Sequence, residues 1–432
     1  MTKKTYVSLG CVGLLICGCS SKEHLKGKRE ELIVSELSGQ SLEETDSSPV
    51  VVDEKEDNSG ECVQPHYTAS HYYMPRKFSL DPSKIWSSSL DFEASSEIKM
   101  TAAPVVAEGK VFCLDAAGIV YAFDQKSGAR LWRKSTTLIG KDGQIGGALV
   151  YDKGRLVVTS SFAEGVCFDA GSGSILWRIK LPAASKGDGI TIDNGKAFIL
   201  CSNSSLHCVD IANGKILWAH SGMISNTAFI GCSCVAIEDG VIYCAYPSGE
   251  IFALLEETGA VIWDAMLSKF SLINAASAFS HPRACPVVKD GVVYFVAANA
   301  QTSAYDTRSG KLLWKNDFGG VQTPIVSGNS IFVFNARSEV ACLNRLTGKP
   351  RWVKSYTRNE KEIADWCSMV LLKDYLLMIS PSGLLTFLSL RNGSIKKVVR
   401  ISESGEGVSV NSTIAGGRLY LLMNSGKIVV YR

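Results

Sequence analysis

Short runs of apolar residues separated by glycine-containing turns repeat along most of this chain. Within each unit, an apolar run such as Ala103–Val106 is followed by a two-residue turn such as Glu108–Gly109, then by a β-rich run such as Val111–Leu114. The runs are four to six residues long and have no helical periodicity, which is typical of short antiparallel strands. The pattern therefore predicts an all-β fold built from hairpins.

The last hairpin of each unit carries a recognisable motif. It consists of a small residue, then x-Asp-x-x-(Ser/Thr/Asn)-Gly-x-x-x-Trp, as in the stretch from Ala122 to Trp132. The motif tryptophans are Trp132, Trp177, Trp218, Trp263, Trp314 and Trp352, in steps of 45, 41, 45, 51 and 38 residues. Four strands per unit at a period of about 45 residues indicate the blades of a β-propeller.

Two irregular copies of the motif predict how the ring closes. A seventh unit has Lys397 where tryptophan is due, and the chain then ends with only three strands. Trp86 precedes Trp132 by 46 residues, one period, and follows no complete unit of its own. We therefore expect an eight-bladed propeller of four-stranded antiparallel blades in which the N-terminal strand completes the last blade. A seven-bladed ring with a loose terminal unit is the alternative.

Positions that recur in the repeat are interpreted as structural. We expect small residues at the inner strands, where blades converge on the axis, and tryptophan wedged between adjacent blades. The motif aspartates are expected to accept hydrogen bonds from the following turn; they are Asp124, Asp169, Asp210 and Asp306. A residue that recurs in every unit is more often structural than catalytic, so no catalytic, cofactor-binding or metal-binding residue is predicted among them.

The first 77 residues differ from the repeats. Residues 1–18 contain Lys3, Lys4 and an apolar run too short to span a bilayer, which indicates a signal peptide. The sequence Ile16 to Cys19 resembles the lipobox of bacterial lipoproteins, which implies lipidation of Cys19. The residue after it is Ser20 rather than the Asp that favours inner-membrane retention in Gram-negative lipoproteins, so the resemblance implies the outer membrane, on its periplasmic side. A plain secretory signal is the alternative.

Residues 19–77 are expected to form a disordered acidic tether, and residues 78–432 the propeller. Residues 20–77 hold 7 Lys/Arg and 12 Asp/Glu with little apolar surface to bury. The net charge of the chain is +3 and no basic block stands out, so we expect no nucleic-acid binding.

The cysteines are interpreted mostly as small buried residues, because they occupy strand positions where other repeats have Ala or Val. Apart from the cysteines of the signal and lipid site, Cys232 and Cys234 are the only close pair and lack a second pair or a histidine cluster, so a zinc site is not expected. Cys62, in the expected tether, is the best candidate for an intermolecular cross-link.

The motif resembles the PQQ-type propeller repeat, which quinoprotein alcohol dehydrogenases share with the BamB-like outer-membrane assembly lipoproteins. The resemblance covers about residues 78–432. The dehydrogenases have adjacent cysteines over the quinone and a calcium-binding set, and neither can be matched here. The resemblance therefore implies a lipid-anchored, non-enzymatic scaffold without a cofactor, whose partners are the outer-membrane assembly machinery or its client proteins. The alternatives are a quinone-dependent dehydrogenase and an unrelated periplasmic or surface interaction module.

Overall fold

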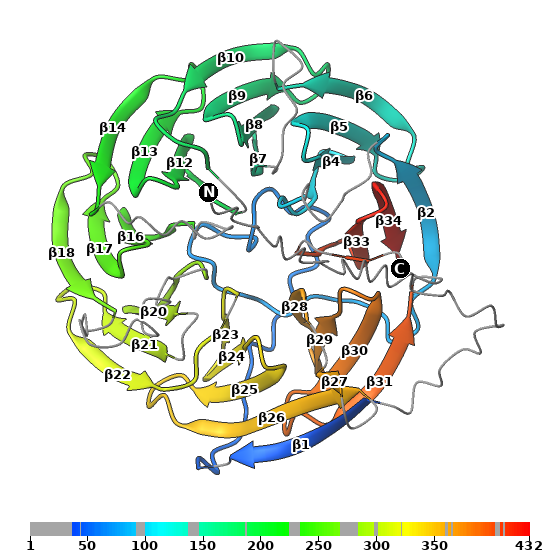
Figure 1. The fold of residues 1–432 in the computed structure, drawn as a ribbon, viewed down its shortest axis with the longest axis vertical. Helices are drawn as coiled ribbons and strands as arrows, with labels where there is room; N and C mark the ends of the chain where they lie inside the picture. The colour runs from blue at the N-terminus through cyan, green and yellow to red at the C-terminus, as the bar shows by residue number, and fades with distance from the viewer. Residues whose placement is uncertain are drawn as a thin grey trace, which may run out of the picture. The chain divides into compact units, whose positions relative to one another are not determined.

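The chain forms a ring of eight antiparallel blades, shown in Figure 1. A computed structural model describes the following residues, to which all structural statements refer: 37–43, 45–91, 100–136, 147–185, 188–223, 234–267, 284–297, 301–320, 322–358, 362–363, 366–401, 407–408 and 411–432. Within these ranges there is no helix long and apolar enough to cross a membrane.

Blades 1 to 4 each contain four consecutive strands. Blade 1 comprises β3 (Val105–Ala107), β4 (Lys110–Leu114), β5 (Ile119–Asp124) and β6 (Arg130–Ser135). Blade 2 comprises β7 (Leu149–Asp152), β8 (Arg155–Ser160), β9 (Glu164–Asp169) and β10 (Ile175–Lys180). Blade 3 comprises β11 (Ile190–Asp193), β12 (Lys196–Cys201), β13 (Ser205–Asp210) and β14 (Ile216–Ser221). Blade 4 comprises β15 (Ala236–Glu238), β16 (Val241–Ala245), β17 (Glu250–Leu255) and β18 (Val261–Met266).

Blades 5 to 8 follow the same order, but blade 6 has two additional strands and the strands of blade 8 come from both ends of the domain. Blade 5 comprises β19 (Val287–Lys289), β20 (Val292–Ala297), β21 (Gln301–Asp306) and β22 (Leu312–Asn316). Blade 6 comprises β23 (Ile325–Ser327), β24 (Ser330–Phe334), β25 (Glu339–Asn344) and β26 (Pro350–Arg358), with β1 (Leu37–Glu43) and β27 (Glu362–Ile363) paired to β26. Blade 7 comprises β28 (Ser368–Leu371), β29 (Tyr375–Ile379), β30 (Leu384–Ser389) and β31 (Ile395–Arg400). Blade 8 comprises β32 (Thr413–Ala415), β33 (Arg418–Met423), β34 (Lys427–Tyr431) and, as its outer strand, β2 (Lys84–Ser89).

The eight-bladed ring and its closure by the N-terminal strand are confirmed. Strand β2 pairs with β34, and Trp86 lies opposite Val430 in this pairing. The ends of the two strands are tied by backbone hydrogen bonds in both directions between Ser83 and Arg432, each 2.9 Å long. Blade 8 therefore joins the two ends of the propeller domain.

The repeated tryptophan of one blade packs under the repeated glycine of the next. A Cβ atom placed on Gly173 would lie 2.8 Å from the ring of Trp132, so the glycine backbone rests directly on the indole. The same contact links seven pairs: Trp86–Gly128, Trp132–Gly173, Trp177–Gly214, Trp218–Gly259, Trp263–Gly310, Trp314–Gly348 and Trp352–Gly393. Glycine and tryptophan are thus conserved in the repeat because each blade supplies one half of a contact between blades.

Each of these indoles also donates a hydrogen bond to the next blade. The acceptor is always the backbone carbonyl three residues before the partner glycine, as for Trp132 Nε1 and Ala170 O at 3.2 Å. The other acceptors, for Trp86, Trp177, Trp218, Trp263, Trp314 and Trp352 in turn, are the carbonyls of Gln125, Ile211, Glu256, Thr307, Arg345 and Leu390. The indole is therefore satisfied at its polar end while its ring fills the space between blades.

The absence of tryptophan at Lys397 follows from the ring closure. In blade 8 the third strand, β34, and the fourth strand, β2, come from opposite ends of the domain, so no glycine turn joins Tyr431 to Lys84. A tryptophan from blade 7 would therefore have no glycine to pack against. Lys397 instead forms an ion pair with Asp81, which lies just before β2. Blade 7, which lacks the motif tryptophan, is thus the blade next to blade 8, where the ring closes.

The prediction of a disordered tether is wrong for residues 45–77, which Figure 1 shows passing inside the ring. The stretch from Asp57 to Arg76, here called the axial loop, closes on itself. Asp57 N donates to Pro75 O at 2.9 Å, and Arg76 Nη2 lies 2.8 Å from Asp57 Oδ2. The predicted signal peptide, the Cys19 site and the rest of residues 19–36 lie outside the described residues.

The axial loop touches all eight blades in ring order. Its hydrogen bonds to the inner strands, or to the turn after the inner strand in blade 8, begin with Ser59 and end with Arg76. The bonded pairs, from blade 8 and then blades 1 to 7, are Ser59–Gly416, Cys62–Val106, Val63–Tyr151, Gln64–Ile192, Ala69–Ile237, Ser70–Val288, Tyr73–Val326 and Arg76–Leu371. The open edges of the inner strands thus satisfy the polar backbone of the loop, which accounts for the order of a segment that the sequence predicts to be disordered.

Candidate functional site

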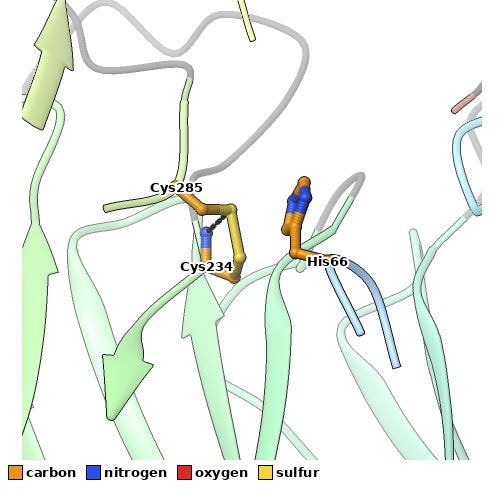
Figure 2. A group of neighbouring side chains, drawn as sticks. All are labelled: His66, Cys234 and Cys285. Atoms are coloured by element: carbon orange, nitrogen blue, oxygen red, sulfur yellow. Dashed lines mark hydrogen bonds between the residues drawn. A yellow bond between two sulfur atoms is a disulfide. The ribbon is translucent and has the colours of Figure 1, made fainter. Parts of the chain in front are cut away.

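The axial loop brings two histidines against two cysteines of the blades. His71 Nε2 lies 3.6 Å from Cys234 Sγ. A ring nitrogen of His66 lies within 4.8 Å of the sulfurs of both Cys234 and Cys285. Figure 2 shows His66 facing the bonded sulfur atoms across a short gap. This is the densest group of potential metal-ligating side chains within the described ranges.

Cys234 and Cys285 form a disulfide because they occupy equivalent positions in neighbouring repeats. Each lies just before the inner strand of its blade, β15 and β19, and their Cα atoms are 5.0 Å apart although 51 residues separate them. Along the sequence, Cys234 stands out only as the close neighbour of Cys232, which lies outside the described residues. The signal that could have revealed the bridge is the shared repeat position, since equivalent inner positions of adjacent blades are neighbours around the axis.

The remaining described cysteines agree with the interpretation as small buried side chains. All eight are buried: Cys62, Cys113, Cys167, Cys201, Cys208, Cys244, Cys342 and Cys367. The prediction of Cys62 as a cross-linking thiol is wrong, because its backbone forms an antiparallel β-bridge with Val106 and the residue is only 6% exposed. Burial raises the pKa of the Cys62 thiol to about 12, so it remains protonated at neutral pH.

The two histidines have different surroundings. His71 is 1% exposed, and its Nδ1 lies 2.7 Å from the carbonyl oxygen of Pro286. Burial lowers the pKa of His71 to about 3, so the imidazole is neutral and Nδ1 donates its proton to that carbonyl. His66 Nε2 lies 3.2 Å from Thr323 Oγ1 and 3.5 Å from Asp188 Oδ2. Both rings are held by groups on the blades.

The cavity beside this cluster is narrow. It has a volume of about 40 Å³ and is lined by the axial loop and by inner strands of several blades, including His66, His71 and Thr323. At roughly 10–15 Å³ per water site, it admits about three water molecules. The axis of this propeller is thus filled largely by its own chain.

The repeat residues singled out from sequence lie away from this cluster. Asp124 Oδ1 accepts hydrogen bonds from the amides of Lys126 and Ser127 and from the Ser127 hydroxyl. Asp169, Asp210 and Asp306 accept equivalent bonds in their own turns. Hydrogen bonds from Ser127 lower the pKa of Asp124, so this carboxylate is ionised and engaged within its turn. These aspartates and the motif tryptophans organise the outer hairpins.

Sequence reasoning missed the apolar character of the outer strands. A β-bulge just before each motif tryptophan, as between Ile175 and Trp177, turns adjacent apolar side chains outward. The exposed residues, each 38–49% accessible, are Ile85, Leu131, Ile175, Leu176, Ile216, Leu217, Val261, Ile262, Leu312 and Leu313. They recur on the outer strands of blades 8 and 1 to 5, which together present apolar side chains to the surroundings.

One outer strand already carries an added strand. β1 pairs antiparallel with β26 from Leu37 opposite Arg358 to Glu43 opposite Val353. Among the described strands, no other outer strand of a blade has such a partner on its outer edge. The outer edge of a blade can therefore extend its sheet by one further strand.

Comparisons with known proteins agree with this architecture. A family model described as "Outer membrane protein assembly factor BamB" matches residues 81–140 and 116–354, more than half of the chain. The chain belongs to the BamB family. Outer membrane protein assembly factor BamB of Salmonella typhimurium is 30% identical over 354 residues, which cover 80% of this chain and 88% of the relative. The Escherichia coli protein of the same name is 30% identical over 332 residues, with 75% and 82% covered.

Solved structures show the same fold. The BamB structure from Moraxella catarrhalis superposes with a TM-score of 0.69 at 18% identity, and the match covers 82% of this chain and all of that one. A europium-containing methanol dehydrogenase superposes with a TM-score of 0.68 at 13% identity, covering 85% and 90%. At these identities the likeness extends to the fold alone, and an assembly factor and an enzyme share it equally.

The ion pair that closes the axial loop is expected to control its attachment. Arg76 is 3% exposed, pairs with Asp57 and stacks over Tyr67 with its guanidinium carbon 3.7 Å from the ring centroid. Removing one partner of a fully buried pair costs about 3–5 kcal/mol, and the cost here is smaller because the side chain of Asp57 is 21% exposed. In Arg76→Ala, the backbone amides of residues 57–76 should therefore exchange hydrogen much faster, as measured by mass spectrometry.

The exposed Lys55 provides a matched control just outside the loop. Lys55→Ala removes a cation of similar length without a buried partner and should leave the exchange rates unchanged. Unaltered protection of residues 57–76 in Arg76→Ala would show that the hydrogen bonds to the blades hold the loop without the ion pair.

Proposed function

We propose that this chain is a lipid-anchored, non-enzymatic scaffold that supports the assembly of β-barrel proteins into the outer membrane. The observation that carries the proposal is the match to the BamB family model across residues 81–354, which span blades 1 to 6 and the closing strand. Relatives named as outer membrane protein assembly factors align with 75–80% of the chain.

The anchor in this proposal is Cys19. Cleavage after residue 18 and lipidation of Cys19 would hold the ring at the outer membrane, on its periplasmic side. Residues 19–36 would then link the lipid to β1, which begins at Leu37 on the outer edge of blade 6. The link to the ring would thus be short, because residues 45–77 pass along the blades rather than extending away from them.

The filled axis supports a role without a catalytic cofactor. The axial loop bonds to all eight blades, and the cavity beside it, among the described residues, has a volume of about 40 Å³, which is too small for a polycyclic quinone. A large flat cofactor at this place would have to displace residues 59–76. We therefore propose that the propeller acts through its surface.

The outer edges of the blades are suited to binding extended polypeptide. β1 on β26 demonstrates sheet extension at this rim, and a strand of a client protein could pair with another outer strand in the same way. Exposed apolar side chains on the outer strand, such as Leu217 in blade 3 or Leu313 in blade 5, 44% and 49% exposed, would contact the apolar face of such a strand. Both features fit partners that are extended, unfolded β-barrel polypeptides.

Cross-linking in the cell envelope tests the proposed function. The tagged full-length chain would be cross-linked in intact cells, recovered from solubilised envelopes and its partners identified by mass spectrometry. We expect components of the outer-membrane assembly machinery or unfolded β-barrel proteins. Recovery of none of these, from a chain that is expressed and folded, would refute assembly function while leaving the fold untouched.

The matched control variant is Cys19→Ala, which removes the proposed lipid site without touching the ring. It should move the protein from the membrane fraction to the soluble periplasmic fraction and reduce the recovery of partners. A membrane fraction unchanged by this substitution would contradict anchoring through Cys19.

A further inference from the structure

Four side chains with the chemistry of transition-metal ligands meet inside the ring. His66 and His71 come from the axial loop, and Cys234 and Cys285 come from the entries to blades 4 and 5. Two sulfur and two imidazole ligands are a common tetrahedral set for Zn²⁺. The sequence pattern conceals this set, because its members are spread over more than 200 residues.

The spacing of the cluster fits such a site. With Zn–S of about 2.3 Å and Zn–N of about 2.0–2.1 Å, tetrahedral angles place sulfur and nitrogen ligands about 3.5 Å apart. His71 Nε2 and Cys234 Sγ are 3.6 Å apart, and His66 and Cys285 offer their ligand atoms within 4.8 Å of Cys234 and of each other. His71 joins the group formed by His66, Cys234 and Cys285 through its approach to Cys234, and metal binding would require the two sulfurs to separate and the ligand atoms to draw closer together.

The surrounding groups orient the histidines as in metal sites. A ligating histidine usually donates its other ring N–H to a carbonyl or carboxylate, which fixes its tautomer. The carbonyl of Pro286 can only accept, so His71 Nδ1 carries the proton and the lone pair of Nε2 faces Cys234. His66 Nε2 similarly faces Asp188 and Thr323, which leaves its other nitrogen for a metal ion.

We propose that His66, His71, Cys234 and Cys285 form a redox-gated site that binds one zinc ion or a similar thiophilic divalent cation. The disulfide must first be reduced by a dithiol, which transfers two electrons and two protons and becomes a disulfide itself. The S–S bond is replaced by two thiols. Binding of the cation then forms two metal–sulfur bonds and releases the two thiol protons.

The two states would connect different parts of the molecule. The disulfide joins blade 4 to blade 5 and leaves the axial loop held by hydrogen bonds and by the Asp57–Arg76 pair. A bound metal would join both blades to the loop through His66 and His71. The redox state and metal supply would therefore determine how firmly the loop is attached, independently of any role in outer-membrane assembly.

Cobalt binding tests the site directly. The full-length chain in detergent would be reduced with a phosphine, exchanged into anaerobic buffer and titrated with Co²⁺. We expect one equivalent to bind with the visible absorption bands of tetrahedral, thiolate-ligated cobalt, and Zn²⁺ to abolish these bands. The unreduced chain should show no bands. Absence of the bands from the reduced, folded chain would overturn the proposal.

Variants separate this site from the other thiols. Cys285→Ala removes a ligand and the disulfide, and His71→Gln removes an imidazole while leaving every cysteine in place. Each should weaken cobalt binding at least about tenfold. Cys244→Ala, at a buried position in β16 outside the cluster, is the matched control and should bind as the parent does.

Circular dichroism would establish that each variant is folded. Should Cys285→Ala fail to fold, His71→Gln alone decides the question, because it changes neither the number of thiols nor the disulfide. Binding by His71→Gln with the affinity and spectrum of the parent would refute the proposed ligand set.

Discussion

Replacing Trp352 with alanine is expected to reduce the free energy of unfolding by about 3–5 kcal/mol, the usual cost of truncating a large buried aromatic side chain. Trp352 is 2% exposed, and its ring lies under Gly393 of the next blade. The substitution also deprives the carbonyl of Leu390 of its hydrogen bond from Nε1, which is 2.9 Å long. Chemical denaturation followed by circular dichroism measures the loss.

The matched control is Leu313→Ala, which truncates a large apolar side chain that is 49% exposed on the outer strand of blade 5. Surface substitutions of this kind usually change stability by less than about 0.5 kcal/mol. A loss below about 1 kcal/mol for Trp352→Ala would mean that the blades are held together without the indole contacts.

Gly348→Ala is expected to cost about 2–5 kcal/mol, although it adds a single methyl group. The residue has a φ of +70°, where a side chain costs about 1–2 kcal/mol. Its Cβ would also lie 2.3 Å from Cε3 of Trp314, and overpacking of this kind typically costs about 1–3 kcal/mol more. The difference in unfolding free energy from the parent chain measures the sum.

Gly195→Ala separates the two contributions. Gly195 has nearly the same φ, +74°, but no atom lies within 4 Å of the added Cβ. Only the backbone cost of about 1–2 kcal/mol is therefore expected. Equal losses in the two variants would show that the blades adjust to the methyl group, and that contact with Trp314 does not explain the glycine of the motif.

The repeat made the propeller predictable from sequence, including its closure. The motif residues act within one blade or between consecutive blades, so their spacing reports the geometry directly. Even the exceptions were informative: Trp86 marked the closing strand, and Lys397 marked the blade beside it. The contact between tryptophan and glycine was not foreseen, because the two residues of one motif touch different neighbours rather than each other.

The axial loop was misjudged because its residues were averaged with the acidic stretch that precedes them. Order in Asp57–Arg76 comes from the inner strand edges of eight blades, which converge only when the ring has closed. Its buried residues, among them Cys62 and Tyr73, are too few to indicate a packed segment when averaged with the acidic residues around them. The composition of a segment indicates how much apolar surface it can bury by itself. It does not report the hydrogen-bonding groups that another part of the chain presents to it.

The candidate metal site shows the same division. The sequence by itself determined the blades, their number and their closure, because short apolar runs, turns and the motif recur about every 45 residues, and the incomplete copies lie at the two ends of the domain. Only the tertiary structure decided that Cys234 meets Cys285 and that His66 and His71 lie against them. Those contacts require the closed ring to bring distant residues to one axis, and no local pattern of hydrophobic and polar positions encodes that convergence.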